Sequence, residues 1–163
     1  MAAIIDQFDI PRDLTVEFLG TFARFEYALK RSGYVKGNEK RIDADWDRLC
    51  QELASADPTA LAPILASCGY LRARPPKKQV LDNGQLAWRV RGASGGSDIG
   101  ELLLSLRTVR NNVFHGGKFP EGPVTDPLRD EQLIRDCLAV MQALLGSPIL
   151  PAGISGHFQP EGL

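Results

Sequence analysis

The sequence predicts an all-α fold, a bundle of helices that carries one small β-hairpin around residues 78–90. Apolar residues recur at helical spacing in three long stretches, which we place at 11–32, 98–116 and 127–145. The Asn83-Gly84 pair separates two short alternating runs, which is the strongest local signal for a hairpin. We expect the long helices to pack as a bundle and the hairpin to lean on them, because two strands alone are marginally stable.

Length and composition are those of one globular domain. At 163 residues, 44% of them apolar and 24% charged, the chain can bury a core of its own. The net charge of −1 gives the whole surface no attraction for nucleic acid, so RNA binding requires a local basic patch. We expect a single helical domain over 1–146, followed by an irregular tail over 147–163 that is rich in proline and glycine.

Cysteine usage and hydropathy bear on the cellular compartment. The three cysteines, Cys50, Cys68 and Cys137, lie in apolar helical contexts without a CxxC pair. This favours buried thiols in a reducing compartment over a disulfide framework or a zinc site. No apolar stretch approaches the length of a membrane span, and no basic and then apolar leader opens the chain. We therefore expect a cytoplasmic protein without membrane association, metal or cofactor.

Capping signals place the ends of the helices. Asp9, with Pro11 two residues later, predicts the start of the first helix, and Gly33 predicts its end. Apolar spacing predicts a second helix over 41–54. The remaining signals are Asp57-Pro58 and Gly69 for a third helix, the capping box of Asp98 and Glu101 for the helix over 98–116, and Asp126-Pro127 with Gly146 for the last.

The most specific stretch is the end of the helix over 98–116, where Arg110, Asn111 and His115 precede a glycine pair. Asn111 and His115 share one face of the helix, whereas Arg110 continues a buried apolar row and lies at its edge. Histidine exchanges a proton near neutral pH, and arginine binds phosphate and stabilises charge on it. RNA supplies its own nucleophile, the ribose 2′-OH, so these side chains suit RNA cleavage. The same side chains also suit an ordinary helix end, with His115 at the C-terminus and Arg110 snorkelling.

The stretch from Arg110 to His115 resembles the R-x4–6-H motif of the HEPN superfamily (higher eukaryotes and prokaryotes nucleotide-binding domain). Its place late in a long helix, before glycine and one more helix, is similar too, and residues 22–30 resemble the first helix of bacterial members. The resemblance covers roughly residues 10–146 and implies a HEPN-type bundle that forms a homodimer with two facing motifs.

For function, the resemblance implies a metal-independent endoribonuclease of bacterial defence or toxin–antitoxin systems, with RNA as substrate and an antitoxin protein as a partner. Carried over by position, Arg110 and His115 are catalytic and Asn111 is the supporting polar residue. Some members of the superfamily keep the fold but bind a nucleotide, RNA or a protein partner without catalysis, so a silent module is the alternative. A third interpretation is a purely structural interaction protein, in which the motif residues pack and cap.

Glu26 is a charged residue in the apolar row of the first helix. A carboxylate there needs a cation or hydrogen-bond donors. We hypothesise that Glu26 pairs with Arg110, since both charges sit in otherwise apolar rows; the alternative is that Glu26 lines a helix edge and binds water.

Basic residues around the hairpin are further candidates for RNA contact, because a cationic strip can hold a phosphate backbone. A run of charge is, however, usually just a solvated face. Trp88 could stack a base or pack against the bundle, and Lys118 could contact phosphate or be a solvated loop lysine. The candidates of the basic run are Arg72, Arg74, Lys77, Lys78 and Arg89.

Overall fold

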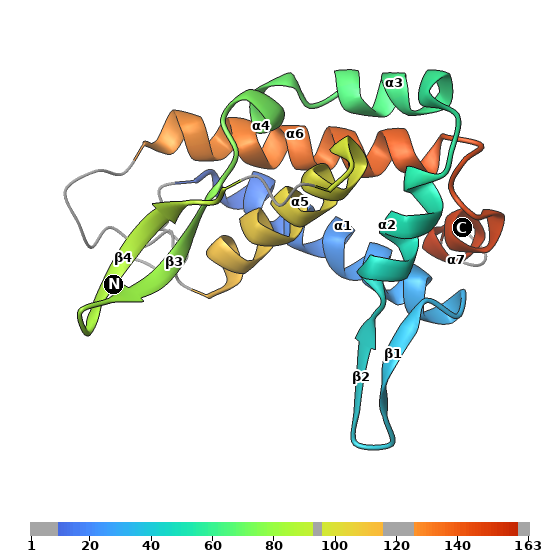
Figure 1. Ribbon diagram of the computed structural model, residues 1–163, viewed down its shortest axis with the longest axis horizontal. Helices are drawn as coiled ribbons and strands as arrows, with labels where there is room; N and C mark the ends of the chain where they lie inside the picture. The colour runs from blue at the N-terminus through green and yellow to red at the C-terminus, as the bar shows by residue number, and fades with distance from the viewer. Residues whose placement is uncertain (1–9, 93–95, 116–125, 160–163) are drawn as a thin grey trace.

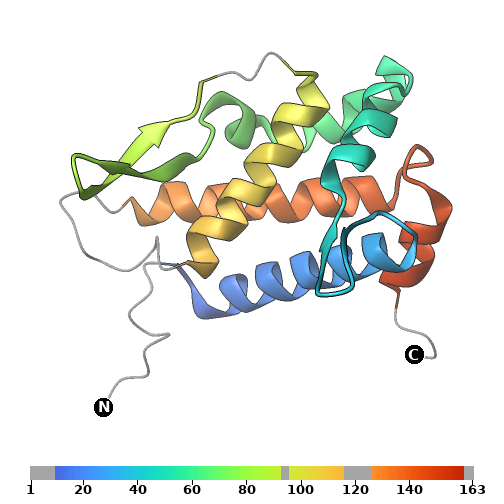
Figure 2. The same cartoon turned by 60° about the horizontal axis from the view of Figure 1, so that its bottom comes forward.

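The computed structural model describes residues 10–92, 96–115 and 126–159. Three long helices carry the core: α1 (Arg12–Arg31), α5 (Asp98–Phe114) and α6 (Pro127–Leu145). Helices α1 and α6 lie side by side, and α5 crosses them (Figures 1 and 2). The shorter elements are α2 (Trp46–Ala54), α3 (Pro58–Ala66), α4 (Gly69–Ala73) and α7 (Ala152–Phe158), with two antiparallel hairpins, β1 (Val35–Asn38) with β2 (Arg41–Ala44) and β3 (Lys77–Asp82) with β4 (Gln85–Val90).

The predicted apolar stripes form the core. Phe18 and Phe25 of α1, Leu106 of α5 and Met141 of α6 are all completely buried. Each buried side chain of this kind stabilises the fold by about 1.5–3 kcal/mol relative to exposure. The stripe predicted for the motif helix is buried along its whole length: Ile99, Leu102, Leu103, Leu106, Val109 and Val113.

Several local signals act as predicted. The Asp57 carboxylate accepts the Thr59 N–H (2.8 Å) and begins α3, and Asp126 accepts the Arg129 N–H (3.1 Å) and begins α6. The β3–β4 hairpin turns at Asn83-Gly84, where both φ angles are positive (49° and 78°). Such a two-residue turn matches the twist of the strands, and asparagine and glycine tolerate it best. Asp9 lies outside the described residues.

The prediction of a helix over 41–54 is wrong at its start. Residues 35–44 form the β1–β2 hairpin, whose turn is closed by the Asn38 side chain accepting two backbone N–H groups (2.9 and 3.2 Å). Gly37 has φ of +139°, which favours glycine. Helix α2 begins only after Asp45, which caps it by accepting the Arg48 N–H (3.1 Å).

Two further helix ends differ from prediction. Helix α3 ends at Ala66, and Gly69 begins α4 instead of ending α3, because the chain turns at Ser67, whose hydroxyl donates to the Ile64 carbonyl (2.7 Å). The capping box of Asp98 and Glu101 does not form. Ser97 is the N-cap and accepts the Gly100 N–H (3.3 Å), which leaves both carboxylates in the first turn of α5, where the helix dipole favours them.

The tail is not irregular over residues 152–158, which form α7 against α1. Ile154 is completely buried, and the Phe158 ring meets the Phe25 ring edge-on at 6.4 Å. The Arg24 Nε also donates to the Phe158 carbonyl (2.8 Å). One turn of apolar spacing between prolines and glycines is too short a signal to predict this helix, which forms because the bundle offers it a surface. Within the described ranges, no helix has the length and apolar character needed to cross a membrane.

Candidate functional site

The last turn of α5 brings the motif side chains to the surface. His115 directly follows α5 and is exposed; its backbone N–H donates to the Asn111 carbonyl (2.9 Å). Its ring meets that of Phe114 edge-on, with centroids 5.2 Å apart. No hydrogen bond joins the imidazole to another residue in the described ranges. The exposed imidazole is therefore accessible to a bound molecule, and histidine is the side chain that ordinarily exchanges a proton near neutral pH.

The Arg110 guanidinium contacts four other side chains. Its Nη1 donates to Asn111 Oδ1 (2.9 Å), and its Nη2 lies 3.9 Å from Glu26 Oε2. The guanidinium also stands over two rings, 5.4 Å from the centroid of Phe22 and 5.2 Å from that of Phe114. The contact predicted between Glu26 and Arg110 is therefore present. About 30% of the Arg110 side chain is still exposed, so the held guanidinium can meet a ligand.

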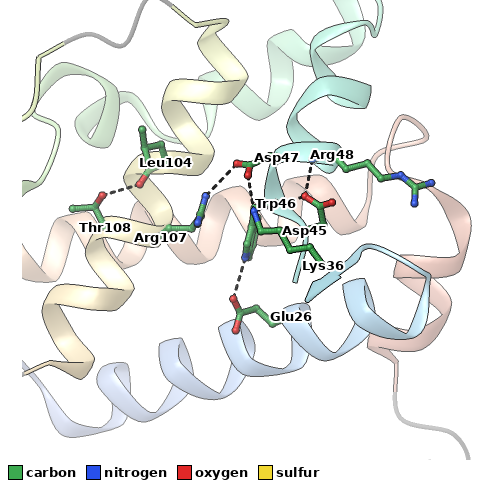
Figure 3. Close-up of polar contacts among 9 residues, drawn as sticks. All are labelled: Glu26, Lys36, Asp45, Trp46, Asp47, Arg48, Leu104, Arg107 and Thr108. Carbon is green, nitrogen blue, oxygen red and sulfur yellow. Dashed lines mark hydrogen bonds and ion pairs between the residues drawn. The ribbon is translucent and has the colours of Figure 1, made fainter. Parts of the chain in front are cut away.

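The Glu26 carboxylate has a second partner. Trp46 of α2 donates its indole Nε1–H to Glu26 Oε1 (3.0 Å, Figure 3). Trp46 is buried and stacks on Phe22 (5.5 Å, 30°) and Phe25 (5.7 Å, 9°). A buried indole normally needs an acceptor for its N–H, and that requirement is the signal in the sequence that could have linked Trp46 to Glu26.

Asn111 lies with Arg110 and not with His115. The sequence places Asn111 and His115 on one helix face, but no contact between their side chains occurs in the described part of the chain. The amide oxygen of Asn111 accepts a hydrogen bond from a guanidinium N–H of Arg110. Asn111 thereby helps to orient the arginine.

A second arginine lies one turn earlier on the same face of α5. The Arg107 Nη1 is 3.8 Å from Asp47 Oδ1, and the other oxygen of Asp47 accepts from the Lys36 ammonium (2.6 Å, Figure 3). The hydrogen bond from Lys36 lowers the pKa of Asp47 below its usual value, with a smaller contribution from Arg107. Arg107 was not predicted as a site residue; its position three before Arg110 was the available signal.

Asn112, in contrast with its neighbour, is buried and joins the hairpin to the motif helix. Its side-chain amide donates to the Lys77 carbonyl at the start of β3 (2.8 Å). At the end of β4, the Arg91 guanidinium pairs with Glu101 (3.0 Å) and donates to the Ser105 hydroxyl (3.0 Å). The β3–β4 hairpin is thus attached to α5 at both of its strand ends.

The residues of the predicted basic strip are all exposed, but several are already paired. Arg72 pairs with Asp98 (3.0 Å), Arg89 pairs with Asp82 (3.2 Å), and Arg74 stands over the Tyr70 ring (5.7 Å). The backbone carbonyl of Lys77, at the base of the hairpin, accepts from Asn112 of the motif helix, and Lys78 lies one residue further along β3.

Two other candidates of the sequence have separate outcomes. Trp88 does not pack in the core, because 39% of its surface is exposed on the hairpin. The β3–β4 hairpin extends to one side of the helical bundle (Figure 1). Lys118 lies outside the described residues.

The cysteines and acidic groups do not form a further centre. Cys68 and Cys137 are buried as predicted, and burial raises the pKa of both thiols, that of Cys68 to about 11. Cys50 is half-buried. In the residues that the structure describes, no group of three or more histidine, cysteine, aspartate or glutamate side chains is arranged to hold a metal ion.

Comparison of the chain with protein-family models, with curated proteins and with solved structures gave no match. Inference about function consequently depends on the chemistry of the motif residues and their neighbours.

Proposed function

We propose that this chain is a metal-independent endoribonuclease of HEPN type, acting as a homodimer in bacterial defence or in a toxin–antitoxin system. The observation that carries the proposal is the arrangement at the end of α5. Arg110 is oriented by Glu26, Asn111 and the rings of Phe22 and Phe114, and the exposed His115 contacts the same Phe114 ring. An oriented phosphate-binding cation beside a proton-exchanging side chain is the minimum that RNA cleavage by its own 2′-OH requires.

In this reaction the ribose 2′-oxygen attacks the adjacent phosphorus, and the bond from phosphorus to the 5′-oxygen breaks. The products are a 2′,3′-cyclic phosphate and a 5′-hydroxyl. His115 takes the proton of the 2′-OH or gives one to the leaving oxygen. Arg110 binds the non-bridging oxygens and stabilises the charge that develops on them. A homodimer with facing motifs would supply one imidazole for each of the two proton transfers.

The contacts of Arg110 favour a catalytic role because they reduce its freedom before substrate binds. A guanidinium that already points in one direction needs little reorganisation when charge develops on the phosphate. Glu26 and Trp46 act as positioning residues in this scheme, since they reach the phosphate only through Arg110.

The test is cleavage of a structured RNA in the presence of EDTA. We expect cleavage by the wild type and a loss of at least about 100-fold in both His115→Ala and Arg110→Ala. Matched controls are His157→Ala in α7 and Arg135→Ala in α6, which replace the same residue types far from the motif in sequence and should cleave normally. Mass spectrometry should find cyclic phosphate ends.

Other outcomes distinguish the alternatives. RNA or nucleotide binding without cleavage would identify a silent HEPN-type module. If His115→Ala and Arg110→Ala change only the free energy of unfolding, the two residues have a packing and capping role. Cleavage that persists in His115→Ala would contradict the proposed mechanism.

A further inference from the structure

Phe114 is an exposed aromatic ring at the centre of the motif. It is the last residue of α5, and 63% of its surface is exposed, although the apolar stripe of the same helix is buried. Leaving a phenylalanine in water forgoes the stabilisation that burial would provide. The exposed ring is therefore available to a bound molecule, and covering it would be favourable.

The neighbours of the ring indicate what kind of molecule fits. The Phe114 ring contacts two polar groups, the Arg110 guanidinium at 5.2 Å and the His115 imidazole at 5.2 Å. An apolar protein surface laid on the ring would also desolvate these polar groups, at a cost. A nucleotide suits the surroundings better, because its base stacks on a ring while its phosphate needs a cation.

Arg107 extends the same face by one helical turn. Positions 107, 110 and 114 follow the helical repeat, so two guanidiniums and one ring form a single stripe along α5. Arg107 is about one-third exposed, and its contact with Asp47 is long at 3.8 Å. Since Asp47 is bound more closely by Lys36 (2.6 Å), the Arg107 guanidinium has donors left for an anion.

We propose that Phe114 and Arg107 form a nucleotide subsite beside the reacting groups. Phe114 stacks on a base next to the cleaved bond, and Arg107 binds the neighbouring phosphate of single-stranded RNA. This subsite rests on the proposed function, because it assigns an RNA strand a path along α5. It also explains why an aromatic residue stands exposed immediately before His115.

The test measures binding and cleavage separately. The binding probe is a short single-stranded RNA with 2′-O-methyl groups, which cannot be cleaved, carrying 2-aminopurine as a base whose fluorescence reports stacking. We expect Phe114→Ala to weaken binding about 5- to 100-fold and to abolish the fluorescence change on binding, while Phe114→Trp retains both. Leu128→Ala is the matched control, since Leu128 is an apolar residue of α6 with 80% of its surface exposed; it should bind as the wild type does.

The role of Arg107 is tested by the salt dependence of binding in the same assay. Arg107→Ala should weaken binding and reduce the slope of log Kd against log salt concentration by about one charge. Arg135→Ala, which removes an exposed arginine from α6, should leave the salt slope unchanged.

The results that overturn the subsite differ from those that overturn the nuclease. The subsite is wrong if the wild type does not bind the probe, or if Phe114→Ala binds it with unchanged affinity. It is also wrong if sedimentation shows that Phe114→Ala only dissociates a dimer, because a second copy then covers the ring. Binding that depends on Phe114 without any cleavage of normal RNA would retain the subsite and reject the nuclease. Cleavage with an unchanged KM in Phe114→Ala would do the reverse.

Discussion

Two adjacent asparagines of the motif should respond to the same substitution in opposite ways. Asn112 is buried, and its side-chain amide donates to the Lys77 carbonyl (2.8 Å), which attaches the β3–β4 hairpin to α5. Asn111 is exposed and accepts from Arg110 (2.9 Å). Asn112→Ala should therefore reduce stability, whereas Asn111→Ala should reduce catalysis.

The magnitude follows from the surroundings of each amide. Removing one partner of a hydrogen bond and leaving the other buried and unsatisfied costs about 1–3 kcal/mol. Since the contact between Asn112 and Lys77 is only partly buried, water can reach part of the freed carbonyl, and we expect about 1–2 kcal/mol. Asn111→Ala removes no buried contact, so the free energy of unfolding should change by less than about 0.5 kcal/mol.

Urea unfolding of the two variants measures these differences, and amide hydrogen exchange localises them. We expect faster exchange over residues 77–90 in Asn112→Ala, because the hairpin loses one of its attachments, and unchanged exchange in Asn111→Ala. In the cleavage assay Asn111→Ala should lose activity, since Arg110 loses an orienting contact. These roles of the two asparagines are contradicted if the free energy of unfolding of Asn112→Ala lies within about 0.5 kcal/mol of the wild-type value, or if Asn111→Ala is destabilised as strongly as Asn112→Ala.

Three further predictions concern stability. Gly20→Ala, at an exposed position in the middle of α1 with space for a methyl group, should raise the free energy of unfolding by about 1 kcal/mol in thermal or urea denaturation. Gly37→Ala should lower it by about 1–3 kcal/mol and disrupt the β1–β2 hairpin, because a Cβ would lie 2.0 Å from the Arg41 carbonyl oxygen and φ is +139°; an unchanged stability would contradict this turn geometry. Burial, followed by the hydrogen bond to Glu52, raises the pKa of Tyr34 to about 12 from 10.0. Because the pKa of Tyr34 is higher in the folded protein than in the unfolded chain, its protonated form stabilises the fold fully below pH 10, and this stabilisation is lost as the pH rises through about 12. Tyr34→Phe should remove this part of the pH dependence of stability and one late step in the absorbance titration of the tyrosines. Identical titrations of the two proteins would contradict the raised pKa.

Much of the fold was predictable because its signals are local. The starts of α3 and α6 depend on an aspartate before a proline, and the β3–β4 turn depends on an asparagine before a glycine. The β1–β2 hairpin and α7 were missed for a physical reason. The hairpin strands are mostly exposed and lack alternation, and α7 is a single short helix whose stability comes from Ile154 and Phe158 packing on the bundle.

The candidate site divides in a similar way. Arg110, Asn111 and His115 were identified from their spacing, and the pairing of Glu26 with Arg110 followed from two charges in apolar rows. Trp46 comes from another helix, and its hydrogen bond to Glu26 depends on how α2 packs on α1, so no spacing within either segment reveals it.

By itself, the sequence determined where the long helices run, where they are capped and which polar residues gather at the end of α5. These properties depend on residues within one or two turns of one another, and their chemistry acts whatever surrounds them. Only the tertiary structure decided that Asn112 anchors the hairpin, that Asn111 faces Arg110 and that Phe114 is left exposed. The burial and contacts of these side chains depend on which segments pack beside the last turn of α5. The packing of the whole bundle decides which segments those are.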